Sequence, residues 1–282
     1  MAATAPGTPP TAASEAESRC AIAPPLTVAR ATERRFPMAV YGCSGSLWNA
    51  TSHIGCIDIV SREILVHGKW EISTPSQMAA GLPLALPERN GVFLDIGANL
   101  GYFSLLFATH GWSVVSVEPM RQNRAALSAS LCLNPSLNVS LHARALTSPP
   151  KQRLRCVARS FPRNQGNGVL TCGANAQCPR PNADPSRRHP CEPVAVGTLD
   201  NLLDEIDISR VDVVKMDVEG SECDVLDGAQ RLLGTLRPRL LQIEGLRENV
   251  VRCVHEHARR FGYTVLPERR GSDQNLVVYR VN

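Results

Sequence analysis

Residues 95–104 read DIGANLGYFS, and this stretch decides how the whole sequence is interpreted. It follows the apolar run Val92–Leu94, which is typical of a buried strand. Leu100, Phe103 and Phe107 then recur at the spacing of one face of a helix. The stretch is therefore predicted to be a turn between a strand and a helix.

Glycine and asparagine alternate in this turn. In an open parallel sheet, ligands bind at the carboxyl ends of the strands, where helix N-termini present free N–H groups. Gly97 and Gly101 place no side chain at this edge, and we interpret them as leaving room for a ligand near the backbone. Asn99 is expected to adopt a left-handed backbone, which asparagine tolerates better than most residues. The sequence thus predicts a ligand-binding turn that also includes Asp95 and Ala98.

Two common nucleotide-binding motifs do not fit the turn. A dinucleotide fingerprint would need glycine where Tyr102 stands, which argues against NAD. A phosphate-binding Walker loop would need Gly-Lys-Ser or Gly-Lys-Thr, and the sequence contains neither. A dehydrogenase on a related sheet is a weaker alternative, which titration with NAD would test.

A carboxylate stands at the end of the second apolar run. Glu118 lies in SVVSVEP, about twenty residues after the glycine turn, where an acid can accept hydrogen bonds from both hydroxyls of a ribose. Taken alone, it could be a solvated carboxylate at a strand end. Together with the turn, we interpret it as a ribose-binding residue.

The rest of the chain alternates short apolar runs with amphipathic stretches, a pattern typical of parallel strands joined by helices. The last residues predict a closing hairpin across RRGSDQ. We therefore predict an α/β protein with a doubly wound, mostly parallel sheet. Further strands are predicted at Ser113–Val117, Leu137–Leu141, Val211–Met216 and Leu240–Ile243.

One domain is expected over residues 36–282, preceded by a disordered tail over residues 1–35 that is rich in Ala, Thr, Ser and Pro. Residues 36–90 are predicted to form an N-terminal cover, in which Trp70 is interpreted as covering the sheet edge rather than the acceptor. Residues 147–193 are rich in Cys, Pro and Arg and show no apolar periodicity, so they are predicted to be an insertion or long loop.

The composition predicts a soluble protein. Apolar residues make up 43% of the chain, which suffices for one core, and no uncharged apolar run reaches the roughly eighteen residues that a membrane span needs. The net charge of +4 comes with no basic stripe interleaved with aromatic residues, so no nucleic-acid groove is expected. The Ala- and Ser-rich start could be an organelle transit peptide, but Glu15 and Glu17 argue against one. The compartment stays open, with the cytoplasm favoured over an organelle or the secretory lumen.

The chain has ten cysteines, and none forms a C-x-x-C pair, which argues against a zinc site. Cys132, Cys223 and Cys253 fall in predicted helices and are interpreted as apolar packing residues. The remaining cysteines of the core region lie in loop-like segments, and they fit disulfides and free thiols equally well. These are Cys43, Cys56, Cys156, Cys172, Cys178 and Cys191.

Five motifs follow one another: FLDIGANLGYFSLLFA, VVSVEP, VGTLDNLL, VVKMDVEGSECDVLDGA and LQIEG. In this order and spacing they resemble the FkbM family of S-adenosylmethionine-dependent methyltransferases, over residues 70–279 without the insertion. The resemblance implies a class I, Rossmann-like methyltransferase fold, whose seven-stranded sheet has an antiparallel last strand. The insertion departs from the compact family pattern and leaves the substrate open.

The resemblance also implies S-adenosylmethionine as the cofactor. Characterised enzymes of the family mostly methylate hydroxyls of natural products or sugars. Carried onto this sequence, the cofactor-binding positions are Asp95, Gly97, Ala98, Asn99 and Gly101 for the methionine end, Glu118 for the ribose and Ala145 for the adenine.

Three carboxylates are candidates for the catalytic base. Asp217 and Glu219 lie in KMDVEG at the end of the fourth strand, and Glu244 follows the fifth strand. Asp217 and Glu219 could equally interact with free N–H groups of the following helix. The three could alternatively hold Mg²⁺, although nothing in their spacing demands it, and we predict no metal.

The predicted function is S-adenosylmethionine-dependent methylation, with a hydroxyl of a small molecule or carbohydrate as acceptor. The alternative is a non-catalytic cofactor-binding or interaction module on the same fold. Neither nucleic acid nor a membrane is expected as a partner, and the oligomeric state is left open.

Overall fold

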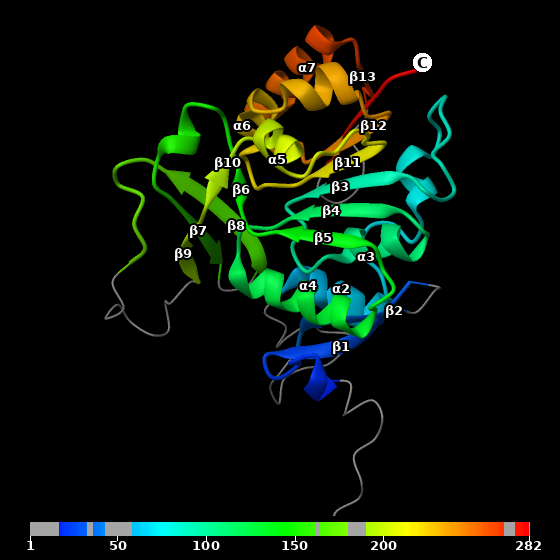
Figure 1. Ribbon diagram of the computed structural model, residues 1–282, viewed down its shortest axis with the longest axis vertical. Coiled ribbons are helices and arrows are strands. Elements are labelled where there is room, and N and C mark those ends of the chain that lie inside the picture. Colours follow the sequence, from blue (N-terminus) through cyan, green and yellow to red (C-terminus); the bar gives the residue numbers. More distant parts are fainter. Residues whose placement is uncertain are drawn as a thin grey trace, which may run out of the picture.

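A computed structural model describes residues 17–32, 36–42, 58–161, 164–179, 190–267 and 274–281, and its centre is a seven-stranded sheet (Figure 1). The strand order is β13-β14-β12-β11-β3-β4-β5. Every neighbouring pair is parallel except the two that involve β14. This confirms the predicted doubly wound sheet with an antiparallel last strand. The strands are β3 (Val92–Ile96), β4 (Ser113–Val117), β5 (Val139–His142), β11 (Val213–Met216), β12 (Leu240–Ile243), β13 (Thr264–Val265) and β14 (Leu276–Tyr279).

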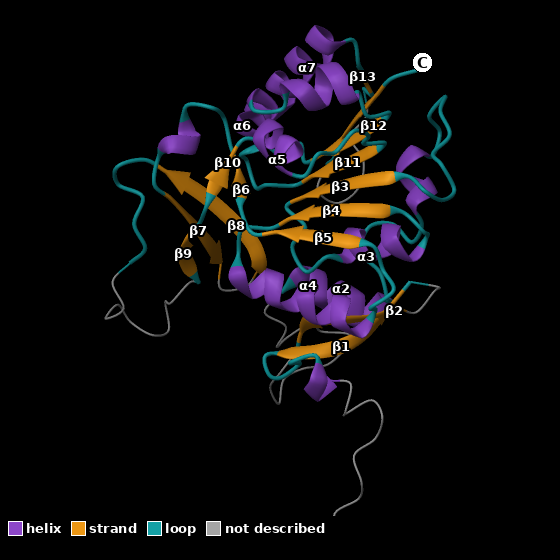
Figure 2. Cartoon of the chain, in the orientation of Figure 1, coloured by secondary structure: helices purple, strands orange, loops and turns teal. Residues whose placement is uncertain are grey.

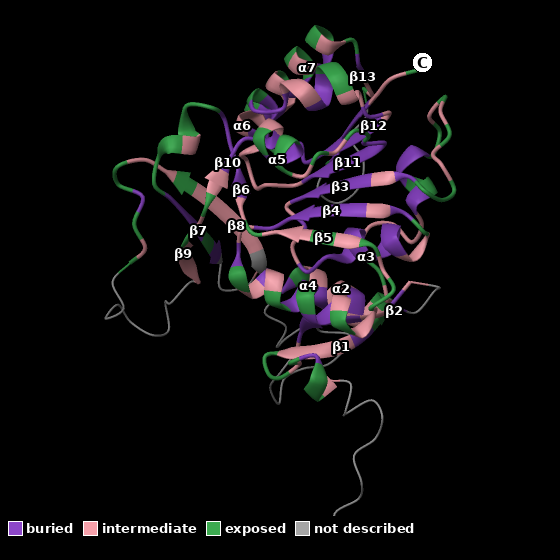
Figure 3. Ribbon diagram, viewed as in Figure 1, coloured by how far each residue is buried: buried purple, intermediate pink, exposed green. Residues whose placement is uncertain are grey.

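Helices cover both faces of the sheet (Figure 2). Successive strand residues point to opposite faces, so that Phe93 packs in one apolar core and Leu94 in the other. The central strands are buried along most of their length, as Figure 3 shows. The first core involves α2 (Ile59–His67), α3 (Tyr102–Thr109) and α4 (Arg121–Leu133), and the second involves α5 (Leu199–Glu205), α6 (Glu222–Asp227) and α7 (Glu248–Phe261). Short helical elements also include η1 (Pro75–Ala79), η2 (Lys151–Arg153) and the π-helical η4 (Leu232–Leu236).

An antiparallel pair of strands precedes the central sheet. Strand β1 (Leu26–Ala31) pairs with β2 (Phe36–Tyr41), and β2 packs on α4, where Ala39 N donates to Ser130 Oγ at 2.8 Å. A disulfide between Cys20 and Cys132 ties the segment before β1 to the same helix. The predicted disordered tail over residues 1–35 is therefore wrong for residues 17–32, because they bury apolar side chains against the core.

The insertion is a small sheet rather than a structureless loop. Antiparallel strands β7 (Cys156–Phe161), β8 (Asn164–Cys172) and β9 (Cys191–Pro193) pair in the order β8-β7-β9. The parallel pair β6 (Ala145–Leu146) and β10 (Val196–Gly197) joins it to the domain. In Figure 1 the carboxyl ends of β3, β4 and β5 point toward this part of the chain.

All eight described cysteines form disulfides, so the interpretation of Cys132, Cys223 and Cys253 as packing residues is wrong. Cys43 and Cys56 lie outside the described residues. The four pairs are Cys20–Cys132, Cys156–Cys172, Cys178–Cys191 and Cys223–Cys253.

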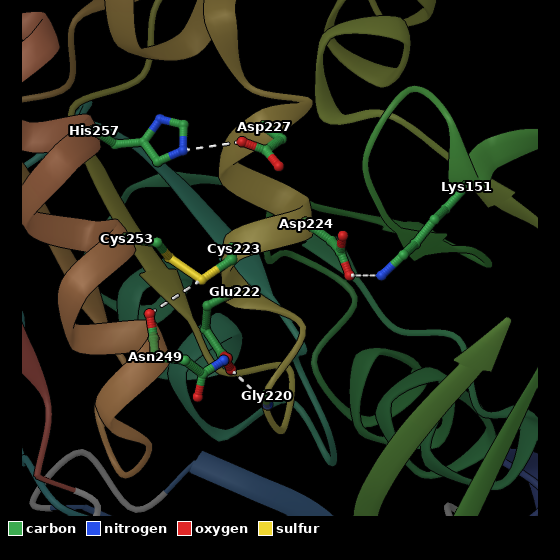
Figure 4. Close-up of a disulfide and its surroundings, with 9 residues drawn as sticks. All are labelled: Lys151, Gly220, Glu222, Cys223, Asp224, Asp227, Asn249, Cys253 and His257. Carbon is green, nitrogen blue, oxygen red and sulfur yellow. Dashed lines mark hydrogen bonds and ion pairs between the residues drawn. A yellow bond between two sulfur atoms is a disulfide. The ribbon is translucent and has the colours of Figure 1, made fainter.

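The disulfide between Cys223 and Cys253 joins α6 to α7 on one face of the sheet (Figure 4). One turn further along, Asp227 accepts a hydrogen bond from His257 Nε2 at 3.1 Å. On its other side, α6 is held to the insertion by an ion pair of 2.7 Å between Asp224 and Lys151. Helix α6 is thus fixed by three side-chain links within two turns.

Removing this disulfide is expected to destabilise the protein by about 2–4 kcal/mol, because the bond closes a long loop in the unfolded chain. The double variant Cys223→Ser/Cys253→Ser should therefore melt roughly 5–15 °C below the wild type in thermal unfolding followed by circular dichroism. An unchanged melting temperature would show that the bond does not form.

Among the described residues, no helix has both the length and the apolar character needed to cross a bilayer.

Candidate functional site

A cavity of ≈ 290 Å³ lies at the carboxyl ends of β3, β4, β11 and β12. The helices α2 and α3, the strand β8 and the Trp70 side chain also contribute to its walls. Of the ten residues predicted for the site, only Gly101 does not line this cavity. The nine that do are Asp95, Gly97, Ala98, Asn99, Glu118, Ala145, Asp217, Glu219 and Glu244.

The turn after β3 has the predicted left-handed backbone at Gly97, Asn99 and Gly101, with φ angles of 81°, 53° and 87°. The reason for the glycines differs from the predicted one. A Cβ on Gly97 would lie 1.8 Å from the backbone oxygen of Asp217, and one on Gly101 would lie 2.2 Å from Leu127 Cδ1. Glycine is needed at both positions because protein atoms fill the space that a side chain would occupy. The residues between them, Ala98, Asn99 and Leu100, line the cavity.

Asn99 offers an acceptor to the cavity. Its Oδ1 is buried and has no hydrogen-bond partner among the described residues, while its backbone N–H donates to Glu118 Oε2 at 2.9 Å. A buried carboxamide oxygen without a partner is unfavourable, so a ligand donor at this place would stabilise the site.

Glu118 is fixed at the end of β4 by three donors. Its Oε2 accepts from Asn99 N, and its Oε1 accepts from Met120 N at 2.8 Å and from Asn123 Nδ2 at 3.4 Å. Burial raises the pKa of this carboxyl from 4.5 to about 7, although the three donors lower it. Each carboxylate oxygen has two lone pairs, so Oε2 retains one for a further donor.

A row of polar residues crosses the sheet just below the cavity. Ser116, Asp95, Lys215 and Gln242 stand side by side on four neighbouring strands. Asp95 Oδ2 accepts a hydrogen bond of 2.5 Å from Ser104 Oγ, and burial raises the pKa of Asp95 to about 6.

Lys215 is the cation of this row. Its Nζ lies 2.9 Å from Asp217 Oδ2, 4.0 Å from Glu71 Oε1 and 4.9 Å from the centre of the Phe103 ring. Burial alone would lower the pKa of Lys215, but the nearby carboxylates of Asp217, Glu71 and Asp95 outweigh it and raise the pKa. The lysine is therefore held charged beneath the cavity.

The same network places the N-terminal cover on the site. Glu71 Oε2 accepts hydrogen bonds of 3.1 Å from both Gln242 Nε2 and Asn275 Nδ2, and Tyr102 Oη donates to Ile72 O at 2.7 Å. These contacts hold Trp70 against the cavity. Trp70 was predicted to cover the sheet edge, and in the structure it lines the cavity at this edge.

Three carboxylates meet at the other end of the cavity. The closest oxygens of Asp217, Glu219 and Glu244 all lie within 4.8 Å of one another. Glu244 is 7% exposed and accepts no hydrogen bond from the described residues. Burial raises its pKa from 4.5 to about 9, and the charges of Asp217, Glu219 and Glu222 add to this effect.

The sequence left open whether Asp217 and Glu219 hold free N–H groups of the following helix. In the structure Glu222 Oε1 accepts from Val218 N and Gly220 N at 3.1 Å, and both of these N–H groups lie in the turn before α6. Asp217 pairs with Lys215 instead. The arrangement can therefore accept protons at Glu244 while Asp217 stays fixed.

Sequence reasoning missed the walls that come from distant segments. Asn164, Asn167, Gly168 and Leu170 of β8 line the cavity, although their stretch of sequence has no periodic pattern. Ile59 of α2 lines it as well and is 41% exposed. Only the topology brings these segments to the site.

Raising the pH is expected to destabilise the protein. Because the folded-state pKa of Glu244 lies near 9 and its ordinary value is 4.5, the folded state binds more protons than the unfolded state between these values. Stability is thus greatest at the acidic end of this window and is lost as the pH rises through 9. Melting temperatures measured from pH 6 to pH 9 should fall for the wild type and change much less for Glu244→Gln. Equal slopes would contradict the raised pKa.

Comparison with known proteins gives a family match. The family model described as the methyltransferase FkbM domain matches residues 95–261. Among curated protein sequences, none matches the chain.

Solved structures of methyltransferases are also similar, at low identity. A precorrin-6y C5,15-methyltransferase from Geobacter metallireducens is 12% identical, with 72% of this chain and 83% of that chain covered and a TM-score of 0.39. An rRNA methylase from Streptococcus thermophilus is 11% identical, with 76% and 98% covered and a TM-score of 0.41. A human methyltransferase 10 domain containing protein is 14% identical, with 67% and 70% covered and a TM-score of 0.39.

Proposed function

Because the chain belongs to the FkbM methyltransferase family and is an S-adenosylmethionine-dependent methyltransferase, we propose that it methylates a hydroxyl oxygen of a small molecule or carbohydrate. The observation that carries this proposal is the meeting of Asp217, Glu219 and Glu244 at one end of the cavity. A carboxylate there can accept the proton that a hydroxyl must lose.

The cavity residues fit the cofactor. Its ammonium and hydroxyl groups are donors, and the cavity presents acceptors to them, including the unpaired Asn99 Oδ1. The methionine end of the cofactor would be held by Asp95, Ala98 and Asn99. No side chain caps the N-terminus of α3 at this place, so the free N–H groups of the helix suit the carboxylate of the cofactor. Glu118 would hold the ribose, and Ala145 would lie near the adenine.

Gly97 and Gly101 support this binding indirectly. They allow the turn to take its left-handed course against Asp217 and Leu127, and this course exposes Ala98 and Asn99 to the cavity. We therefore propose that the two glycines shape the cofactor site through the course of the turn, and of the two, Gly97 also lines the cavity.

The bound cofactor supplies a methyl group on a positively charged sulfur. The protein must mainly align the acceptor oxygen, and positioning of this kind can supply about 7–11 kcal/mol. Lys215 fixes the Asp217 carboxylate, which would orient the acceptor hydroxyl. Glu244 would remove the hydroxyl proton, because burial raises its pKa to about 9 and it accepts no hydrogen bond from the described residues.

The side chains at the end of the cavity with Asp217, Glu219 and Glu244 favour a neutral acceptor. Two further acidic side chains, Asp217 and Glu219, meet Glu244 here, and the nearby Lys215 is already paired with Asp217, so nothing at this end favours a polyanionic nucleic-acid backbone. The side chains of Ile59 and Leu246, which are 41% and 53% exposed, add apolar surface to the lining. A neutral acceptor with both hydroxyl and apolar parts fits these features.

A non-catalytic module is the alternative. It would need the disulfide-linked insertion to contact a partner, but β8 of the insertion lines the cavity and so belongs to the site. This supports an enzyme over an interaction module.

We also propose that the protein works in an oxidising compartment. Four disulfides involve every described cysteine, and they link both the insertion and the helices around the site. Alkylation of the unreduced protein before mass spectrometry should then leave these eight cysteines unmodified.

Incubation with methyl-labelled cofactor and a fractionated extract of the source tests the reaction. We expect one class of compound to gain label on a hydroxyl oxygen, identified by mass spectrometry of the product. Label on nitrogen or carbon would overturn the proposed acceptor class, and transfer to nucleic acid would overturn the exclusion of that partner. A parallel incubation with Glu244→Gln serves as the low-activity control.

A further inference from the structure

The insertion strand β8 carries a bulge where it meets the cavity. Its pairing with β7 is regular from Cys172 to Gly168, which lies opposite Ser160, but the next pair joins Phe161 to Asn164. Residues 165–167 are therefore extra on β8. Bulges next to functional sites redirect side chains out of the regular alternation, and here both Asn164 and Asn167 line the cavity.

Both asparagines present unused acceptors. The Oδ1 atoms of Asn164 and Asn167 are buried, and neither has a hydrogen-bond partner among the described residues. Two buried carboxamide oxygens left without donors are unfavourable unless a ligand satisfies them. The ligand group at this wall should therefore be a hydrogen-bond donor.

The topology places this wall at one end of the cavity. Along the sheet, Glu244, Asp217, Gly97 and Glu118 follow the strands β12, β11, β3 and β4 in spatial order, with Arg144 after β5. The carboxyl groups of Asp217, Glu219 and Glu244 thus lie toward one end of this row, and Glu118 lies toward the other.

Contacts of the insertion fix it at the end of β4. A Cβ on Gly168 would lie 2.6 Å from Met120 Sδ, and Met120 N donates to Glu118 Oε1. Glu192 of β9 accepts a hydrogen bond of 2.7 Å from Arg121 N at the start of α4. The bulge therefore stands beside Glu118, away from the acceptor end.

Of the hydrogen-bond donors of the cofactor, one remains for the oxygens of Asn164 and Asn167. Its donors are the ammonium, the ribose hydroxyls and the amino group of adenine. The ammonium belongs at Asp95 and the hydroxyls at Glu118, as proposed above, and this inference rests on that placement. We propose that Asn164 and Asn167 recognise adenine by accepting hydrogen bonds from its exocyclic amino group, which has two hydrogens for two oxygens.

Binding of two demethylated ligands tests this assignment. S-adenosylhomocysteine carries the amino group, whereas S-inosylhomocysteine has a carbonyl oxygen there and would face two acceptors. By isothermal titration calorimetry, wild-type protein should bind the adenosyl ligand about 10- to 100-fold more tightly, because the inosyl ligand leaves the buried oxygens unpaired. In Asn164→Ala/Asn167→Ala this preference should fall to about threefold or less.

Asn175→Ala is the matched control, since Asn175 lies in the same insertion but is exposed and does not line the cavity. It should keep the wild-type preference. Thermal unfolding and intact disulfides establish that each variant is folded. The proposal is overturned if wild type binds the two ligands equally, if the double variant keeps the preference, or if it loses affinity for both ligands equally, as expected for contacts to the ribose. None of these outcomes depends on the acceptor, so the proposed O-methylation stands or falls separately.

Discussion

Replacing Gly97 by alanine is expected to destabilise the fold by more than about 4 kcal/mol, which is exceptional for a single methyl group. The added Cβ would lie 1.8 Å from the backbone oxygen of Asp217. Neither strand can move aside freely, because Asp217 N donates to Ile96 O at 2.9 Å in the ladder between β11 and β3. The positive φ of 81° adds backbone strain of roughly 1–2 kcal/mol. Thermal unfolding should show a fall in melting temperature of more than about 10 °C.

The variant Gly111→Ala separates the steric clash of the added Cβ from the strain of the positive φ. Gly111 has nearly the same φ, 80°, but a Cβ there would come no closer than 3.7 Å to any atom of Arg89. This variant should be destabilised only by the backbone strain, which costs about 1–2 kcal/mol. If the two variants melted alike, the close approach of β3 and β11 would not be the reason for glycine at position 97.

Glu244→Gln is expected to lower the rate of methyl transfer by about 10²- to 10⁴-fold, the usual contribution of a general base. Glutamine keeps the shape of the side chain but cannot take up the hydroxyl proton. Because burial and the neighbouring carboxylates raise the pKa of Glu244 to about 9, wild-type turnover should increase as the pH rises toward 9. Transfer of label to the same acceptor fraction, measured between pH 6 and pH 9, reports both effects.

Two controls accompany this measurement. Glu256→Gln, which changes an exposed acid on α7, should turn over like the wild type. Affinity for S-adenosylhomocysteine should be nearly the same in Glu244→Gln as in the wild type. A variant that retained full activity and the same pH profile would exclude Glu244 as the base and return the role to Asp217 or Glu219.

The sequence predicted the central sheet well because its signals are local. Ser113–Val117 and Leu240–Ile243 are strands with the predicted bounds, since each is a short apolar run between amphipathic stretches. The left-handed backbone of Asn99 was also predictable from its place between two glycines. What occupies the space beside Gly97 was not, because Asp217 lies 120 residues further along the chain.

The outer parts of the site escaped prediction for physical reasons. Strands β7 and β8 are held by the disulfide Cys156–Cys172 and by packing on Met120, so they need no alternating apolar pattern of their own. Disulfide pairing cannot be deduced from sequence alone, and the link from Cys20 to Cys132 spans 112 residues. The position of Trp70 likewise depends on the distant network of Glu71 and Lys215. None of these contacts can be predicted from local sequence patterns.

Calorimetric titration of S-adenosylhomocysteine into the oxidised protein tests the central claim, that the turn after β3 and Glu118 at the end of β4 form the cofactor site. At a pH above the Glu118 pKa of about 7, the account predicts saturable binding at one site, weakened about 10- to 150-fold in Glu118→Gln, because hydrogen bonds to a charged carboxylate are lost. Glu192→Gln should bind like the wild type, since Glu192 lies near the same helix but does not line the cavity. Absence of binding at millimolar concentration to folded protein, or an unchanged affinity in Glu118→Gln, would contradict it.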